Sequence, residues 1–449
     1  MNRSYIRVQT SSCVILFVLF FLIFPGLSHA SIFQVLGAAG RDMSMGNAMT
    51  AAAEDWSASF FNPSLLTRKQ TMTLGVGFQL GIPMMTTQTS KNAAVATPNN
   101  ILGLSMGMAI PIGGVLKKRV YFGYIFFIPG LDFYRINFRD PSTPHYYMYD
   151  SLIAKFEFLP SFAVRITDWL SVGVGMRMMA TVPGGFSLNM DVANTRITKR
   201  EMYFGAQASA AANAGIHTQP FKNLIIGASY QGEIALEINM PGDFKVDGLD
   251  FQANILLIGK AQWTPHTISF GATYLIERVQ LRVASDLVYA MWSRAPDPAL
   301  FFKIHMQGGD LEKLGLKNGI SLPVNAENKP QSPGFSDTLS WRLGLEYTPK
   351  KWISLRTGYM YRPTPVPIQT TGTNILDNSL HMLTIGTGFV FKDPLEILEQ
   401  PIAVDIGGQL GVLAPRFHKK EIQNEPVGDI HSQGFIYGLS FVVKYTFGS

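Results

Sequence analysis

The sequence predicts an all-β transmembrane barrel of about fourteen antiparallel strands, an even number as in single-chain outer-membrane barrels. Three observations support this prediction. Apolar and polar residues alternate along many segments, and tight connections alternate with long ones between those segments. After the N-terminal segment, no stretch has the roughly 18 consecutive apolar residues that a spanning helix needs, although 47% of all residues are hydrophobic and only 15% are charged.

Residues 1–30 are expected to be a secretory signal peptide. Arg3 and Arg7 precede the apolar run Val14 to Phe24, and cleavage is expected after Ala30. The only cysteine, Cys13, leaves with this segment, so the mature chain has no disulfide. Loss of the two arginines lowers the net charge from +6 to +4. Without a Lys/Arg run, nucleic acid is not an expected partner.

Strict alternation is clearest close to the C-terminus. In Leu339 to Tyr347, apolar residues occupy every odd position, and Ser, Arg, Gly and Glu occupy the even ones. Since side chains of a strand point alternately to its two faces, such segments are predicted strands. The predicted strands are 71–82, 102–112, 119–129, 153–166, 169–182, 200–217, 223–238, 253–276, 279–293, 338–348, 352–361, 380–391, 401–413 and 435–447.

The lengths of the connections distinguish a membrane barrel from a soluble β protein. Thr167-Asp168 and Glu277-Arg278 are tight turns, whereas 130–152, 183–199 and 294–337 are long. Short turns on the periplasmic rim and long loops on the outer rim are typical of outer-membrane barrels. A soluble secreted sheet would need a second layer over one face, and small polar residues on the inner face fit a wet lumen better. The aromatic-rich last strand is expected to close the barrel.

Residues 31–70 read as a plug of short helices inside the barrel, with 71–449 forming the wall. Ala48 and Ala51 to Ala53 favour helix, and Asp42 is placed to cap one. Asn62-Pro63 is expected to end another, because proline disfavours helical geometry in the residue before it.

Several segments resemble the FadL family of outer-membrane channels for long-chain fatty acids and other hydrophobic compounds. The N-terminal part of the likeness comprises Gly37 to Arg41, with Gly40 and Arg41 in the motif, and then Met45 to Ala48, Ala51 to Asp55 and Phe61-Asn62-Pro63-Ser64. Ser64 stands where the family usually has Ala. The C-terminal part comprises Tyr289 to Ser293, Trp352 to Gly358, Pro363 to Pro367, Asp377 and Leu383 to Phe389.

The resemblance implies a fourteen-stranded barrel with a lumen plug, in the outer membrane of a Gram-negative bacterium. It implies apolar lumen pockets and a sideways exit near an inward kink of the third strand, for which Gly123 and Pro129 are the candidates. Long-chain fatty acids are the expected substrate, and a monoaromatic hydrocarbon is the alternative. The protein is expected to contact outer-membrane lipid, lipopolysaccharide and the barrel-assembly machinery. It is expected to be a monomer and to need no cofactor.

Candidate ligand-binding residues combine aromatic side chains with inward cations. The aromatic candidates are Phe33, Trp56, Phe60, Phe61, Phe126 and Phe127. Arg165 and Arg177 are the candidates for a carboxylate headgroup, which arginine holds through paired hydrogen bonds. The alternative is that the aromatics attach the plug to the wall, and that the arginines pair with inward carboxylates. By alternation the other inward cations are Lys155, Arg282, Arg342, Arg356 and Lys444, and the carboxylates are Glu157, Asp286, Glu346 and Asp405.

Two rival functions start from the same fold. A barrel phospholipase would need a nucleophile paired with a histidine base, and no histidine lies in a convincing serine-containing motif. No metal-ligand spacing is present either, so no enzyme and no metal are expected. A barrel that serves as a scaffold for secretion or adhesion stays open, because loop 294–337 is long enough to hold a partner.

Overall fold

A computed structural model describes residues 37–113, 119–130, 143–149, 156–181, 184–191, 196–205, 207–247, 251–298, 301–307, 324–327, 332–394, 396–422 and 424–448. The expected signal peptide, Phe33 and Lys155 lie outside this range. Among the described residues, no helix is both long and apolar enough to cross a membrane.

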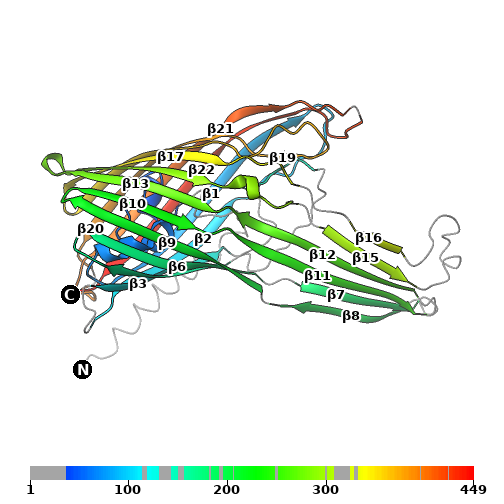
Figure 1. Ribbon diagram of the computed structural model, residues 1–449, viewed down its shortest axis with the longest axis horizontal. Coiled ribbons are helices and arrows are strands. Elements are labelled where there is room, and N and C mark those ends of the chain that lie inside the picture. The colour runs from blue at the N-terminus through cyan, green and yellow to red at the C-terminus, as the bar shows by residue number, and fades with distance from the viewer. Residues whose placement is uncertain are drawn as a thin grey trace, which may run out of the picture.

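Fourteen antiparallel strands form a closed barrel, which confirms the predicted fold (Figure 1). The first strand pairs with the last from Thr73–Thr446 to Thr89–Ile430, so no wall edge is left open. In order round the wall the strands are β1 (Thr73–Thr89), β2 (Ile101–Pro111), β3 (Val120–Pro129), β5 (Phe156–Arg165), β6 (Leu170–Thr181), β9 (Gln207–Phe221), β10 (Leu224–Gln231), β13 (Thr267–Ile276), β14 (Leu281–Ala290), β17 (Thr338–Lys350), β18 (Ile353–Arg362), β20 (Leu380–Phe391), β21 (Ile402–His418) and β22 (Ile430–Thr446).

The wall strands have an apolar outer face and a mixed inner face. In β22, Phe435, Leu439 and Phe441 point outward and are about half exposed, whereas Ser440 and Val442 are buried on the lumen side. Apolar side chains that water would solvate poorly are stable here only against lipid. The period-two pattern therefore corresponds to lipid outside and plug inside.

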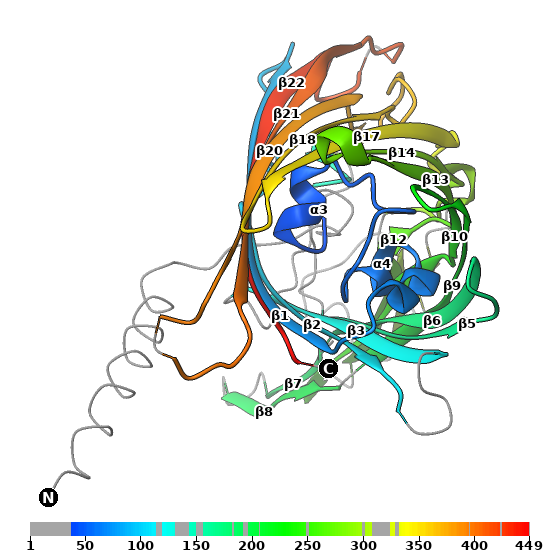
Figure 2. The ribbon, with the colours of Figure 1, turned by 90° about the vertical axis from the view of Figure 1, so that its left-hand side faces the viewer.

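The segment from Gly37 to Arg68 lies inside the barrel (Figure 2). It contains the helices α3 (Gly40–Ser44) and α4 (Ala58–Phe61) and the 3₁₀ helix η1 (Pro63–Arg68). Almost all of its side chains are buried. Asp42 lies in the first turn of α3 instead of capping it, so that detail of the prediction is wrong.

Asn62 joins the two helices at the end of the plug. Its backbone is extended, which ends α4 before Pro63, and its side chain accepts the Ser64 backbone N–H at 3.2 Å to begin η1. Proline suits the first turn of such a helix, because its missing N–H would have no partner there.

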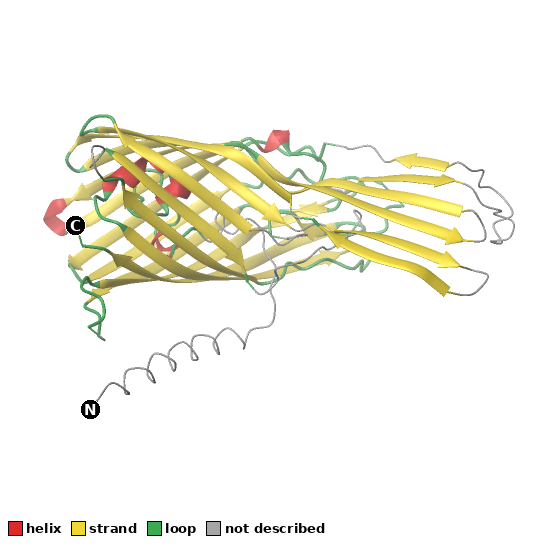
Figure 3. Ribbon diagram, turned by 90° about the horizontal axis from the view of Figure 1, so that it is seen from below, coloured by secondary structure: helices red, strands yellow, loops and turns green. Residues whose placement is uncertain are grey.

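A second, six-stranded sheet projects from the outer rim of the barrel (Figures 1 and 3). Its strands are, in order across the sheet, β16 (Val324–Glu327), β15 (Phe301–Gln307), β12 (Phe251–Thr264), β11 (Ile234–Asp247), β7 (Gly184–Asp191) and β8 (Arg196–Phe204). Three hairpins from three wall connections build it, held together by parallel β11–β7 and antiparallel β12–β15 pairing.

This sheet corrects several predicted strand limits. The predicted strand 253–276 is two strands, β12 in the projecting sheet and β13 in the wall, and 223–238 likewise runs from β10 into β11. The predicted loops 183–199 and 294–337 contain β7, β15 and β16 and the start of β8. Met84 and Met85, predicted in a loop, lie in the long strand β1.

Shorter elements cover the outer mouth of the barrel. The strands β4 (His145–Tyr146) and β19 (Ile375–Leu376) form a small parallel pair. The 3₁₀ helix η4 (Trp292–Arg294) follows β14, and η3 (Glu277–Val279) makes a tight turn on the opposite rim. Trp292 packs with Trp263 and Phe335 in a buried aromatic cluster, with ring centroids 5.6 and 6.3 Å apart.

Candidate functional site

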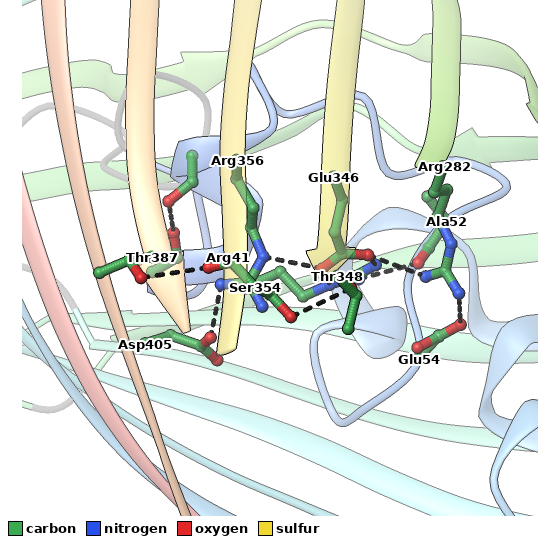
Figure 4. A network of polar contacts seen from close by, with 12 residues as sticks. Arg41, Ala52, Glu54, Arg282, Glu346, Thr348, Ser354, Arg356, Thr387 and Asp405 are labelled. Carbon is green, nitrogen blue, oxygen red and sulfur yellow. Dashed lines mark hydrogen bonds and ion pairs between the residues drawn. The ribbon is translucent and has the colours of Figure 1, made fainter. Parts of the chain in front are cut away.

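A network of buried ion pairs fastens one side of the plug to the wall (Figure 4). Arg41 of α3 binds Glu346 of β17 through both Nε and Nη2, at 2.9 and 2.8 Å. The same carboxylate accepts Nε of Arg356 at 2.7 Å, and Arg356 also bonds Asp405 at 2.6 Å. Because Arg41 and Glu346 are both buried, each needs the other to compensate its lost hydration.

The network continues from the segment between the two helices of the plug. Lys444 of β22 contacts Asp55 at 3.0 Å and Asp405 at 2.6 Å. Glu54 binds Arg282 at 2.7 Å. Burial alone would raise the pKa of Glu54, but the cations Arg282 and Arg41 outweigh it and hold the pKa at about 2. This side of the plug therefore stays ionised and attached near neutral pH.

Asp42 is the exception within this charged region. Its carboxyl group is buried and lies close to Asp55, and together burial and that negative charge raise its pKa to about 8. Its one hydrogen bond among the described residues comes from the Ser57 hydroxyl, at 3.3 Å. Asp42 is therefore mostly protonated at neutral pH.

Hydrogen bonds, without an ion pair between plug and wall among the described residues, hold the other side of the plug against β5, β6 and β9. Ser64 Oγ lies 2.7 Å from Asn62 Oδ1 and 3.0 Å from His217 Nδ1. Thr67 Oγ1 donates to Ser171 Oγ at 3.0 Å, and Asn213 Nδ2 donates to the Ser59 carbonyl at 2.7 Å. No ion pair is involved in these contacts.

Glycines in the wall let the plug approach closely on this side, as Gly344 and Gly358 do on the charged side. A methyl group added at Gly173 would lie 2.4 Å from the backbone N of Ser64, and one at Gly215 would lie 2.0 Å from Asn62 Oδ1. A methyl at Gly123 would lie 2.6 Å from Leu66 Cδ2. From the sequence, Gly123 was interpreted as a kink of the third strand, and Gly173 and Gly215 were given no role.

A small cavity of about 70 Å³ lies between the plug and the wall. Phe60, Phe61 and Thr50 line it from the plug, while Val288, Trp292, Met360, Arg342 and Arg362 are among the residues that line it from the wall and the outer mouth. Phe60 and Phe61 make an edge-to-face contact, with centroids 5.0 Å apart. Polar residues, among them Gln231, Ser269 and Ser340, make up about half of the lining, so apolar and polar groups share this cavity.

Of the predicted ligand-binding residues that the structure describes, Phe60 and Phe61 line this cavity and the others do not. Trp56 is buried against β1 and β2, where its ring fills the space left by Gly75 and Gly107. Phe127 is buried and Phe126 packs against Phe158, with centroids 6.2 Å apart.

The two predicted headgroup arginines lie elsewhere and have partners. Arg177 pairs with buried Glu157 at 3.0 Å, and its Nη1 donates to Thr264 Oγ1 at 3.0 Å. Arg165 donates to the Thr67 carbonyl and lies over the Tyr121 ring. Two other arginines line the cavity: Arg342, which the sequence already placed among the inward cations, and Arg362, which it did not.

The third wall strand pairs regularly where the lateral opening is predicted. β3 keeps one register with β2 from Tyr121 to Pro129 and one with β5 from Val120 to Phe127. Pairing between β5 and β6, in contrast, lacks partners for Leu159 and Pro160. A proline cannot donate a ladder hydrogen bond. The lateral opening at Gly123 and Pro129 stays a prediction.

No curated protein sequence matches this chain. Solved structures do: a FadL homologue from Pseudomonas aeruginosa has a TM-score of 0.59 at 13% identity, over 94% of this chain and 99% of that one. The toluene transporter TodX of Pseudomonas putida has a TM-score of 0.57 at 12% identity, over 92% and 100%. The monoaromatic hydrocarbon channel CymD has 0.57 at 14%, over 93% and 99%. These likenesses show the fold.

The sequence model of the outer membrane protein transport family (OMPP1/FadL/TodX) matches residues 26–444. This match covers nearly the whole chain and agrees with the closed fourteen-stranded barrel. The chain belongs to the OMPP1/FadL/TodX family and is an outer-membrane β-barrel channel for hydrophobic substrates.

Proposed function

We propose that this channel takes up long-chain fatty acids by diffusion through apolar spaces between the plug and the wall. The observation that supports the proposal is the lumen cavity, in which plug phenylalanines Phe60 and Phe61 face Trp292 and Met360. Burying an acyl chain releases roughly 0.8 kcal/mol per CH₂. An apolar space can therefore extract such a chain from lipid or dilute solution, whereas a water-filled lumen cannot.

In this proposal the plug blocks hydrophilic solutes, and the cargo leaves sideways into the membrane. The missing pairs at Leu159 and Pro160 support an exit between β5 and β6, next to the predicted site on β3. A wall that lacks ladder bonds there opens at lower energetic cost than a fully paired one. The protein acts as a monomer in contact with outer-membrane lipid and lipopolysaccharide, after insertion by the barrel-assembly machinery.

A monoaromatic hydrocarbon is the second candidate substrate. Two proteins with this fold are a toluene transporter and a monoaromatic hydrocarbon channel. An uncharged ring needs only the apolar part of the cavity, so the aromatic lining serves it equally well.

The test is uptake of radiolabelled oleate and toluene by cells that lack their own channel. We expect the wild-type protein to raise oleate uptake several-fold over an empty vector. Phe61→Asp, which puts a charge into the cavity, should abolish that gain. Phe162→Asn, on the lipid face outside the cavity, is the control for general effects of a polar substitution. If neither compound enters and a second protein co-purifies, the barrel is a scaffold instead.

A further inference from the structure

The projecting sheet has one apolar and one polar face. Residues that stand opposite each other in neighbouring strands share a face, and successive rows alternate between the two faces. The row across β7, β11, β12 and β15 that consists of Leu188, Phe244, Ala253 and Met306 is apolar. The next row in these strands, Asn189, Lys245, Gln252 and Gln307, is polar. The row on the other side of the apolar one, Ser187, Asp243, Asn254 and His305, is polar again.

Contacts between side chains agree with this assignment of the faces. A methyl group added at Gly242 would lie 2.7 Å from the Phe186 ring, so these two residues share the apolar face. On the polar face, Gln252 Nε2 donates to Asn254 Oδ1 at 3.0 Å. Phe186 is 46% exposed and Met202, opposite it in β8, is 73% exposed. The apolar face is therefore open to solvent at this position.

Membrane lipid does not reach the apolar face. Tyr230 at the end of β10, Tyr289 at the end of β14 and Trp341 near the start of β17 are exposed on the outside of the wall. Such aromatic residues form the girdle at the outer membrane interface. The strands β11, β12 and β15 continue beyond this level (Figures 1 and 3). An apolar sheet face in water is unfavourable, so this one needs a second layer.

The apolar face points away from the outer mouth of the barrel. Residues 295–297 follow the cavity residue Trp292 and lie over the base of the polar face, where they line one hollow with Glu237 and Lys260. In β10, exposed Tyr230 shows that even-numbered residues face lipid, and even-numbered residues of β11 form the apolar face. A two-fold axis along the membrane normal can therefore bring the apolar faces of two neighbouring copies together.

The size of the apolar face fits a specific interface. Six strands make the sheet about 25–30 Å wide, and the paired length from Gln252 to Ile258 is about 20–25 Å. Two such faces would bury about 1,000–1,500 Å² in total, which reaches the range of about 1,200–2,000 Å² for stable interfaces. Arg200 of the edge strand β8 stands opposite Leu188. At the rim of such an interface its charge stays hydrated.

We propose that two copies of this chain associate through the apolar faces of their projecting sheets, outside the membrane. The two faces pack about 10 Å apart as a two-layer sandwich, with β8 of one copy opposite β16 of the other. Each barrel keeps its own lumen cavity and works as a single channel. The pairing is thus independent of which compound the channel carries.

Cysteine cross-linking in intact outer membranes tests the pairing. Cys13 lies in the expected signal peptide, so an introduced cysteine is the only thiol expected in the mature chain. Ile255→Cys lies on the apolar face of the central strand β12, close to the two-fold axis, and its neighbour Leu256→Cys lies on the polar face. With a thiol cross-linker about 10 Å long, Ile255→Cys should give a band of twice the chain mass at least about fivefold stronger than Leu256→Cys.

Charge substitutions in the Ile255→Cys chain give a second measurement. Leu257→Asp puts a carboxylate on the apolar face of both copies and should weaken the cross-linked band at least about tenfold. Leu256→Asp, on the polar face of the same strand, is the matched control and should change the band less than about twofold. The shift of the folded barrel on heated gels shows which variants have folded.

Three outcomes would overturn the proposal. Equally strong bands for Ile255→Cys and Leu256→Cys would mean random collision in the membrane. The absence of a band, or a band with a different protein, would mean that a second copy does not occupy the apolar face. Loss of oleate uptake in Leu257→Asp with an unchanged cross-link would make this face a docking site for cargo instead.

Discussion

The plug contacts the wall through two sides of different chemistry. Toward β14, β17 and β22 it is held by ion pairs such as Arg41–Glu346 and Lys444–Asp55. Toward β5, β6 and β9 the described residues form no ion pair between plug and wall, and the plug is held by hydrogen bonds and by the close glycine contacts that both sides share. Removing one member of a buried ion pair leaves an uncompensated charge, whereas losing a neutral bond costs about 1 kcal/mol. The neutral side is therefore the side at which the plug can shift at lower cost.

The largest effect is expected at Lys444, which bridges two carboxylates. Lys444→Met leaves Asp55 and Asp405 without this partner and should lower the free energy of unfolding by about 3–5 kcal/mol. Urea unfolding in lipid vesicles measures the loss, and conductance in planar bilayers should rise as the plug loosens. Lys392→Met, in an exposed turn, is the control. An equal change in both variants would show that the network does not hold the plug.

Because the carboxyl group of Asp42 is mostly protonated in the folded protein, the free energy of unfolding is expected to depend on pH through this residue. Its folded pKa of about 8 exceeds the ordinary value of about 3.9. Between these values the folded state keeps a proton that the unfolded state has lost, so the wild type loses stability as the pH rises. Asp42→Asn lacks this loss. Its stability relative to wild type should rise by up to about 1.4 kcal/mol per pH unit up to pH 8. Parallel profiles from pH 5 to 9 would contradict the assignment.

On the neutral side, the glycine contacts should matter more than single hydrogen bonds. Gly173→Ala places a methyl group 2.4 Å from the Ser64 backbone and should cost about 1–3 kcal/mol as the plug is pushed away. Gly408→Ala is the matched control, because its nearest neighbour lies 3.9 Å away. The same urea titration compares the two. Similar losses would mean that barrel glycines act through backbone flexibility and not through contact with the plug.

The smallest effect is expected at Ser64, the position that departs from the usual family residue. Ser64→Ala removes the contacts with Asn62 and His217 and should cost about 1 kcal/mol. Ser59→Ala is the control, because Ser59 Oγ is buried and has no hydrogen-bond partner among the described residues. Urea unfolding of wild type and of both variants at one pH measures the two losses of stability. A larger loss for Ser59→Ala would contradict this account of the neutral side.

Alternation predicted the wall because lipid outside and plug inside impose opposite polarities on successive residues. It could not predict where the wall ends. β12 and β13 are separated only by Pro265-His266, and the period-two pattern runs through both strands. The boundary depends on pairing partners that are distant in sequence.

The candidate site was predictable only in part for a similar reason. Alternation placed Arg177 and Arg342 on the same inner face, but it did not show that Arg177 pairs with Glu157 while Arg342 donates to the Asn47 carbonyl of the plug. Arg41 and Glu346 are separated by 305 positions, so their pairing follows from the barrel geometry alone. Phe60 and Phe61 were identifiable because a break in the chain follows them directly.

The projecting sheet limits which insertions and deletions this protein can accept during evolution. Surface loops usually accept insertions and deletions independently. Here three connections share one ladder, with the β11–β12 hairpin in the middle. Deleting that hairpin would leave β7 and β15 each with an open edge prone to pairing with other chains. Deleting the β15–β16 hairpin would open only the edge of β12. Length variation in descendants of this chain should therefore begin at the outer hairpins and spare the central one.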